Sequence, residues 1–117
     1  MLFRSAALAA SDVALCRSGA STLTELAALG LPSVLVPLPP GFTGSPQTVN
    51  AQMFRRAGAA EMVLDRDLTP ESLGKALYPL LDNPPRRALM ASATRTLAHR
   101  DAAATIAEMV AALARRA

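Results

Sequence analysis

Three short apolar segments alternate with helical patterns along the chain, and this alternation constrains the fold more than any other feature. The segments cover Asp12–Cys16, Ser33–Pro37 and Glu61–Leu64. The apolar run 34–36 inside the second segment is typical of a strand that is covered on both faces of a sheet. Strands that alternate with helices are expected to pair in parallel through right-handed crossovers. The sequence therefore predicts an α/β fold in which helices flank a short three-stranded parallel sheet.

Helices are expected before, between and after these strands. Gly30 and Pro32 form a stop signal for the helix that begins at Ser21. Thr69 is the expected N-cap of a later helix, and Pro70 suits its first turn. The expected helices cover residues 2–11, 21–29, 46–57, 70–81, 85–98 and the segment after Asp101.

The composition fits one small domain with an aliphatic core. The chain has 117 residues, of which 51% are hydrophobic and 18% charged, and its aromatic residues are three Phe and one Tyr. A chain of this length forms one domain at most, and Ala, Leu and Val must fill its core. The single cysteine, Cys16, excludes a disulfide within the chain, and no His/Cys spacing indicates a metal site.

The charge pattern narrows the expected partners. The net charge is +3, and many of the arginines stand in pairs, at 55–56, 86–87 and 115–116. No basic run is interleaved with the aromatic residues that stack on single strands, so nucleic acid is not an expected partner. Each pair taken singly is explained as a solvated helix face, whereas the overall balance suits phosphate or an anionic membrane surface. Since no apolar run approaches the roughly 18 residues of a membrane span, we expect a cytoplasmic protein that can touch the membrane peripherally.

The turn after the first strand carries small and polar residues where parallel sheets bind ligands, beyond the carboxyl ends of the strands. Gly19 and Ala20 let a ligand approach the backbone, and the N–H groups of a helix start favour phosphate. Ser21, Thr22 and Glu25 share one face of the first helical turns, where a carboxylate can accept two hydrogen bonds from the vicinal diol of a ribose. A second interpretation stays open, because Thr22-x-x-Glu25 is also the spacing of a capping box.

A second ligand position is expected where the Pro/Gly-rich loop 38–46 leads into a helix. Gln47 and Asn50 are three residues apart and face the same way. Amide side chains both donate and accept hydrogen bonds, so they suit sugar hydroxyls. Ordinary solvent exposure of a helix start is the alternative interpretation. Cys16 is expected to be a buried small residue rather than a nucleophile, and His99 a surface residue in a turn between helices.

The turn after the first strand and the helix start at Gln47 resemble segments of a known family. The segment Asp12–Leu26, with its Gly-Ala-Ser-Thr-x-x-Glu block, is similar to the C-terminal domain of MurG-type N-acetylglucosaminyltransferases. The similarity extends over about residues 6–114. Further matching blocks are Gly30–Pro32, Val34–Pro37, Gln47-x-x-Asn50-Ala51, Ala57–Ala60, Leu68–Pro70 and Asp101–Ala103.

The resemblance implies the GT-B fold of glycosyltransferase family 28, with one lobe for UDP-N-acetylglucosamine and another for a lipid-linked acceptor. Such an enzyme transfers N-acetylglucosamine to lipid-linked muramoylpentapeptide in peptidoglycan synthesis, with inversion and without a metal or other cofactor. A helix N-terminus can stabilise the departing diphosphate instead. Carried over by position, Glu25 binds the ribose hydroxyls, and Gln47 binds the sugar with Asn50 nearby. The residues implied around the diphosphate and sugar are Gly19, Ala20, Ser21 and Thr22.

The resemblance also sets what this chain is expected to lack. Residues 1–117 would form a single partial domain, the second half of the Rossmann-like nucleotide-sugar lobe. The acceptor lobe and the glycine-rich phosphate turn would lie outside it, so the chain alone is not expected to turn over. Pro46 also departs from the family, which often carries Gln or His there. The alternatives are a related transferase subunit that needs a partner chain and a non-catalytic module that binds a nucleotide sugar or a protein.

An incomplete sheet has a consequence for association. Strand 13–16 would normally pair with a strand from the first half of the lobe, and its edge would be open here. An open apolar edge can pair with another chain. We therefore expect a homodimer, through this edge or through helix 2–11.

Overall fold

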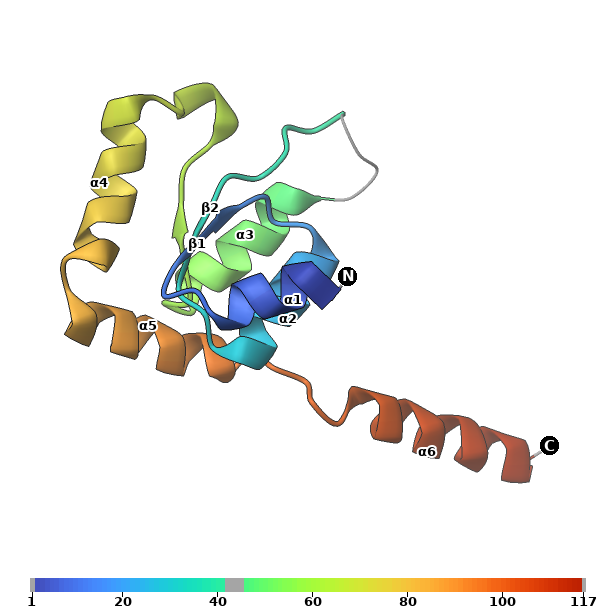
Figure 1. Cartoon of the computed structure of the whole chain (residues 1–117). Coiled ribbons are helices and arrows are strands. Elements are labelled where there is room, and N and C mark those ends of the chain that lie inside the picture. The colour runs from blue at the N-terminus through green and yellow to red at the C-terminus, as the bar shows by residue number, and fades with distance from the viewer. Residues whose placement is uncertain (1, 42–45, 117) are drawn as a thin grey trace.

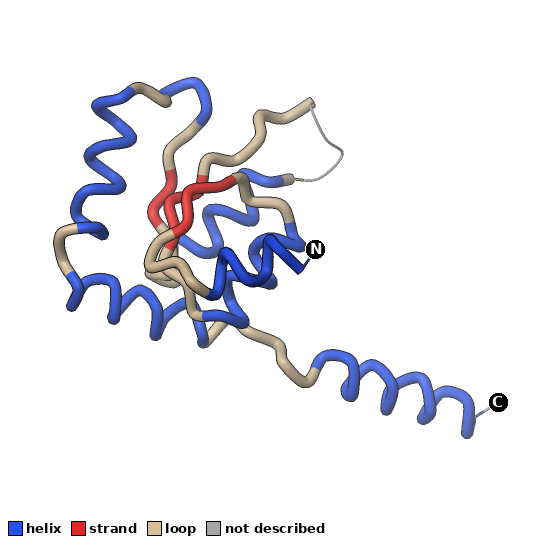
Figure 2. Tube along the Cα trace, viewed as in Figure 1, coloured by secondary structure: helices blue, strands red, loops and turns tan. Residues whose placement is uncertain are grey.

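A three-stranded parallel sheet lies at the centre of the molecule (Figures 1 and 2). The computed structural model describes residues 2–41 and 46–116. The strand order is β1-β2-β3, and both pairings are parallel, so the predicted α/β fold with a short parallel sheet is confirmed. The strands are β1 (Ala14–Cys16), β2 (Ser33–Leu35) and β3 (Glu61–Met62).

Helices precede β1, connect the strands and follow β3 (Figure 1). Helix α2 links β1 to β2 and α3 links β2 to β3, as parallel pairing requires. A short 3-10 helix, η1, follows β3 before the C-terminal helices begin. The bounds are α1 (Leu2–Ala9), α2 (Ala20–Leu29), α3 (Gln47–Arg56), η1 (Asp65–Asp67), α4 (Pro70–Leu81), α5 (Pro84–Arg95) and α6 (Ala102–Arg116).

The central strand β2 is buried on both faces. Successive side chains of a strand point to opposite faces, so Val34 and Leu35 enter two different clusters of buried residues. Leu35 packs with Leu26 and Phe54 of α2 and α3, whereas Val34 shares a cluster with Leu80 of α4 and Met90 of α5. Both strand residues are 0% exposed, which explains why this run shows no polar alternation.

Helix ends follow the predicted capping residues, with small shifts. Helix α2 ends at Leu29 because Gly30 adopts the left-handed conformation, φ 64°, and its N–H caps the helix. Thr69 caps α4, and Pro70 opens it, as predicted. The prediction that Pro46 lies in the first turn of α3 is wrong, because its ψ of 73° puts it before the helix. Residues 42–45 of the predicted Pro/Gly-rich loop lie outside the described residues.

Two apolar surfaces of the described chain have little cover. β1 forms one edge of the sheet, and its Leu15 is 48% exposed. Helix α6 projects from the rest of the molecule, and none of its described residues is buried (Figure 1). Among the described residues, no helix combines the length and apolar character needed to cross a bilayer.

Candidate functional site

The start of α2 lies directly beyond the carboxyl end of β1. Gly19 is the N-cap residue, with φ −66° and ψ 150°, and it offers no side chain to cap the helix. The first bond along the helix runs from the Leu23 N–H to the Gly19 carbonyl at 3.0 Å. The N–H groups of Ala20, Ser21 and Thr22 precede that bond and have no acceptor within the helix. Together with the helix dipole they favour an anion such as phosphate.

The capping-box interpretation of Thr22-x-x-Glu25 is wrong. A capping box requires Thr22 at the N-cap, but that position belongs to Gly19, and Thr22 lies inside α2. The Thr22 hydroxyl accepts a hydrogen bond from the guanidinium of Arg4 in α1 instead. Neither Thr22 nor Glu25 therefore closes its own helix, and both contact Arg4.

Glu25 lies one turn into α2, on the side that faces α1. Its side chain is 29% exposed, and its Oε2 is 3.6 Å from Nε of Arg4. Oε2 is enclosed and accepts no hydrogen bond from the described residues. An enclosed carboxylate oxygen without such a bond is costly, and the positive charge of Arg4 partly offsets that cost. Arg4 could not be found from the sequence, since no local spacing connects it with α2.

Gln47 begins α3 and is almost fully enclosed, at 9% exposed. Its Oε1 accepts a hydrogen bond from the Leu38 N–H at 3.0 Å. Its Nε2 lies beside Gly19, where an added Cβ would be 3.6 Å from it. The amide thus fixes the loop after β2, while its nitrogen faces the start of α2. The assignment of Gln47 to the sugar stays a prediction.

Ser18 connects the two predicted ligand positions, at the starts of α2 and α3. Its hydroxyl, which is fully buried, donates to the Gln47 carbonyl at 2.7 Å. Asn50 Nδ2 donates to the Ser18 carbonyl at 3.5 Å. The structure therefore brings the starts of α2 and α3 together, and Asn50 braces the turn after β1. Ser18 lies within the matching segment Asp12–Leu26, and no spacing in the sequence connects it with Gln47.

Arg17 ties the ends of the sheet together. Its guanidinium NH1 is 2.6 Å from Asp65 Oδ1, in the 3-10 helix after β3. The same nitrogen approaches the carbonyl oxygens of Val36 and Pro37, after β2, at 3.3 and 3.5 Å. One side chain from the end of β1 thus contacts the segments that follow both other strands. Arg17 thus fixes the spacing between the carboxyl ends of the strands, beside which the candidate site lies.

The other reactive side chains show no catalytic arrangement. Cys16 is partly buried, and this burial raises the pKa of its thiol, while the nearby charge of Arg4 acts in the opposite direction. The thiol is therefore protonated at neutral pH, as expected for a packing residue. His99 is exposed in the turn between α5 and α6. Among the described residues, no three His, Cys, Asp or Glu side chains form a group that could hold a metal ion.

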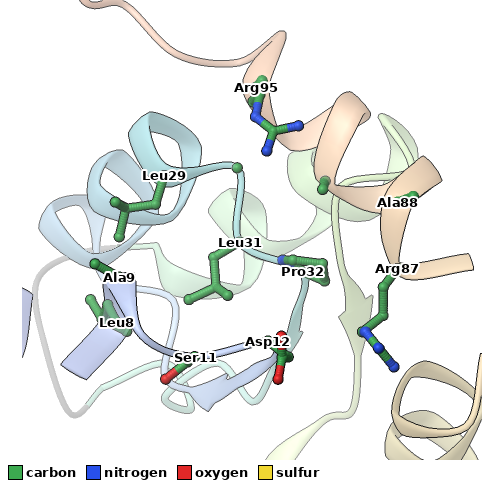
Figure 3. Close-up of a pocket in the computed structure, with 12 residues that line it drawn as sticks. Leu8, Ala9, Ser11, Asp12, Leu29, Leu31, Pro32, Arg87, Ala88 and Arg95 are labelled. Carbon is green, nitrogen blue, oxygen red and sulfur yellow. The ribbon is translucent and has the colours of Figure 1, made fainter. Parts of the chain in front are cut away.

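Two hollows of the surface differ in their position relative to the candidate site. One of about 290 Å³ lies at the amino ends of the strands, near Asp12, Pro32 and Arg87 (Figure 3). It is therefore on the opposite side from the starts of α2 and α3. Another, of about 380 Å³, is lined in part by Ala20 and Asn50 and borders the candidate site.

The geometry is that of a parallel-sheet ligand site, and a family model decides to which group it belongs. The model of the glycosyltransferase family 28 C-terminal domain matches residues 4–106. The chain belongs to this family. The match includes Arg4, both helix starts and the residues of the candidate site.

The curated relatives of this family 28 chain are transferases much longer than the chain itself. One from Mycobacterium ulcerans (strain Agy99) is 44% identical over 109 residues, which cover 93% of this chain and 27% of the relative. It is named UDP-N-acetylglucosamine--N-acetylmuramyl-(pentapeptide) pyrophosphoryl-undecaprenol N-acetylglucosamine transferase. A transferase of the same name from Salinibacter ruber (strain DSM 13855 / M31) is 50% identical over 110 residues, 94% of this chain and 29% of the relative. The chain thus spans less than a third of either protein.

Solved structures show the same fold. A crystal structure of MurG from Acinetobacter baumannii superimposes with a TM-score of 0.80 and 33% identity, over 91% of this chain and 31% of that one. The glycosyltransferase VinC, in complex with dTDP, superimposes with a TM-score of 0.63 and 26% identity, over 79% of this chain and 22% of that one. The predicted relation to the GT-B C-terminal lobe of MurG-type enzymes is confirmed.

Proposed function

We propose that this family 28 chain is the UDP-N-acetylglucosamine-binding part of a hexosyltransferase that adds N-acetylglucosamine to lipid-linked muramoylpentapeptide. The observation that carries the proposal is the uncapped start of α2, with Glu25 one turn further along the same helix. That arrangement offers free N–H groups for a diphosphate and a carboxylate for a ribose diol within one helix. The names of the curated relatives support the choice of nucleotide sugar.

The proposal gives each site residue a separate task. Ala20, Ser21 and Thr22, with Gly19 before them, face the diphosphate through their backbone N–H groups. Glu25 accepts hydrogen bonds from the ribose hydroxyls. The remaining two residues, Gln47 and Asn50, are assigned to the sugar, and their contacts with Gly19 and Ser18 support a position beside the start of α2.

Transfer needs more than these residues. The relatives are more than three times as long as the matched segment, and we assign the acceptor site to that remaining length. Residues 1–117 then act as one partial domain of the donor lobe. The proposed location is the cytoplasm, at the inner face of the membrane where the lipid-linked acceptor lies.

Saturation-transfer NMR on this chain with UDP-N-acetylglucosamine, UDP-glucose and UDP tests the proposal. We expect saturation to reach the uridine protons of all three ligands. Among the sugar protons, it should reach only those of UDP-N-acetylglucosamine. Equal sugar signals from both nucleotide sugars would indicate a related transferase of different specificity. No signal from any of the three would overturn nucleotide binding and favour a protein-binding module.

We also propose that the chain self-associates through the open edge of β1 or through α1. Within residues 2–41 and 46–116, β1 pairs only with β2, and Leu15 on it is half exposed. An unpaired edge offers backbone N–H and carbonyl groups to a second strand. A two-fold pairing of edges is the simplest closed assembly for identical chains.

A further inference from the structure

Arg4 contacts two residues of the candidate site. It lies in α1, which packs against α2, and its guanidinium reaches two site residues at once. One terminal nitrogen donates to the Thr22 hydroxyl, and Nε lies 3.6 Å from Glu25 Oε2. These two partners stand on the same face of α2, one turn apart.

The two contacts differ in what they fix. The hydrogen bond to Thr22 holds the planar guanidinium in one orientation, because an arginine presents its donors as a rigid fork. The charge of the held guanidinium then attracts Oε2 of Glu25 and restricts the carboxylate. Oε2 is enclosed, whereas the Glu25 side chain as a whole is 29% exposed, so the rest of it reaches the surface. A glutamate on a helix surface without such a partner would sample several rotamers.

We propose that Arg4 is a positioning residue of the ribose site, which orients the Glu25 carboxylate toward the vicinal diol of the nucleotide. This inference rests on the proposed function. Arg4 lowers the ordering cost of ribose binding, because the carboxylate is restricted before the ligand arrives.

A competing interpretation assigns Arg4 directly to the diphosphate. Its side chain is 47% exposed, and a guanidinium has five N–H donors, so some remain for a phosphate. The two interpretations differ in which part of the ligand loses affinity when Arg4 is replaced. If Arg4 positions Glu25, its replacement weakens only ligands that carry the ribose diol. If Arg4 binds the phosphate, its replacement weakens every ligand with a diphosphate, with or without the diol.

The binding test compares UDP, 2′-deoxy-UDP and uridine on the unaltered chain and on Arg4→Met. We expect the Kd of UDP and of uridine to rise by about threefold to tenfold, the effect of roughly one hydrogen bond. The Kd of 2′-deoxy-UDP should change by less than about twofold, because this ligand lacks the diol. Equal losses for UDP and 2′-deoxy-UDP, with uridine unaffected, would overturn the inference in favour of the phosphate role. Arg66→Met, which removes an arginine that is 81% exposed, is the matched control and should change none of the three.

A ligand-free measurement separates this inference from the proposed function. Three-bond NMR couplings about χ1 of Glu25 should indicate one rotamer in the unaltered chain and averaging in Arg4→Met. Unchanged couplings would show that Arg4 does not orient Glu25, even if nucleotides bind. Absence of binding by the unaltered chain would instead overturn the proposed function and, with it, the ribose role of Arg4.

Discussion

Glu25 is the only acidic residue of α2, and it stands close to a helix start that attracts anions. Glu25 lies beyond the first turn of α2, so the helix dipole, which acts mainly within that turn, does little for its carboxylate. Arg4, whose Nε is 3.6 Å from Oε2, is the positive charge beside this carboxylate. In the proposed site, Glu25 therefore acts together with Arg4 rather than alone.

Glu25→Ala is expected to raise the Kd of UDP-N-acetylglucosamine at least about tenfold, since each hydrogen bond to a charged group contributes about 1.5–3 kcal/mol. The free energy of unfolding should change by less than about 0.5 kcal/mol, because Glu25 caps nothing and Ala favours a helix. Calorimetric titration and urea unfolding measure the two effects. Glu71→Ala, which removes an exposed first-turn acid of α4, is the control and should leave nucleotide affinity unchanged. A loss of stability without a loss of affinity would contradict the ribose role.

Gln47→Ala is expected to weaken UDP-N-acetylglucosamine while it leaves UDP nearly unaffected. It should also lower the free energy of unfolding by about 1–3 kcal/mol, because the Leu38 N–H loses its acceptor. Titration with both ligands separates the effect on the sugar from the effect on the fold. Gln52→Ala, on the same helix, is the matched control. Parallel losses for UDP and the nucleotide sugar would mean that Gln47 only supports the loop.

Among single residues, the sequence predicted those site residues whose partners are close in the sequence. Ser21, Thr22 and Glu25 were found because helical spacing puts them on one face. Arg4 and Leu38 were not found, since their contacts with Glu25 and Gln47 depend on how α1 packs and how the loop after β2 returns. The choice between a capping box and a ligand site was also left open. One backbone fact, that α2 begins after Gly19, excludes the capping box, and the ligand site stays a prediction.

At the scale of elements, the sheet is short and its ends need support. Each described strand has two or three residues, so few hydrogen bonds between strands hold their carboxyl ends together. Arg17 adds contacts across that edge, to the loop after β2 and to Asp65 after β3. The site therefore depends on side chains that fasten its elements as well as on those that face the ligand.

Arg17→Met is expected to lower the free energy of unfolding by about 1–2 kcal/mol, the sum of a partly exposed ion pair and weak carbonyl bonds. The difference from the unaltered chain should shrink in about 1 M salt, where the ion pair is screened. Urea unfolding at low and high salt measures both. A loss that does not depend on salt would show that packing of the arginine stem, not its charge, holds the edge.

Gly30→Ala tests the end of α2. The left-handed φ of 64° costs an alanine about 1–2 kcal/mol. In addition, the new Cβ would lie 2.5 Å from Nε of Arg95. Thermal unfolding of Gly30→Ala and of Gly30→Ala with Arg95→Ala separates the two costs. The double variant should recover only the part due to Arg95, and full recovery would show that the backbone conformation is not strained.

Element types were predicted more accurately than their limits. Gly30, Thr69 and Pro70 identify helix ends because their backbone preferences act locally. β3 was predicted over four residues but has only Glu61 and Met62, since strand length depends on what β2 offers for pairing. The prediction for α5 ran to residue 98, whereas the helix ends at Arg95, and no glycine or proline marks that end.

For the whole molecule, the open edge of β1 should govern association. Leu15→Lys is expected to shift the chain from dimer to monomer at micromolar concentration, because a charged side chain on an edge strand opposes pairing. Sedimentation equilibrium gives the mass directly. Leu89→Lys, at a leucine of α5 that is 75% exposed, should leave the dimer intact. A monomer of 12.2 kDa from the unaltered chain would contradict the proposed self-association.

The projecting α6 affects how that measurement must be made. A compact chain of this length has a radius of gyration of about 13 Å, whereas this one has 16.3 Å and extents of 58 × 35 × 29 Å. A radius of 16.3 Å corresponds to a compact chain of roughly 200 residues. On a gel-filtration column calibrated with globular standards, a monomer would elute at nearly the volume of a small dimer. Methods that depend on frictional size would therefore not distinguish an extended monomer from a compact dimer, whereas light scattering and equilibrium sedimentation would.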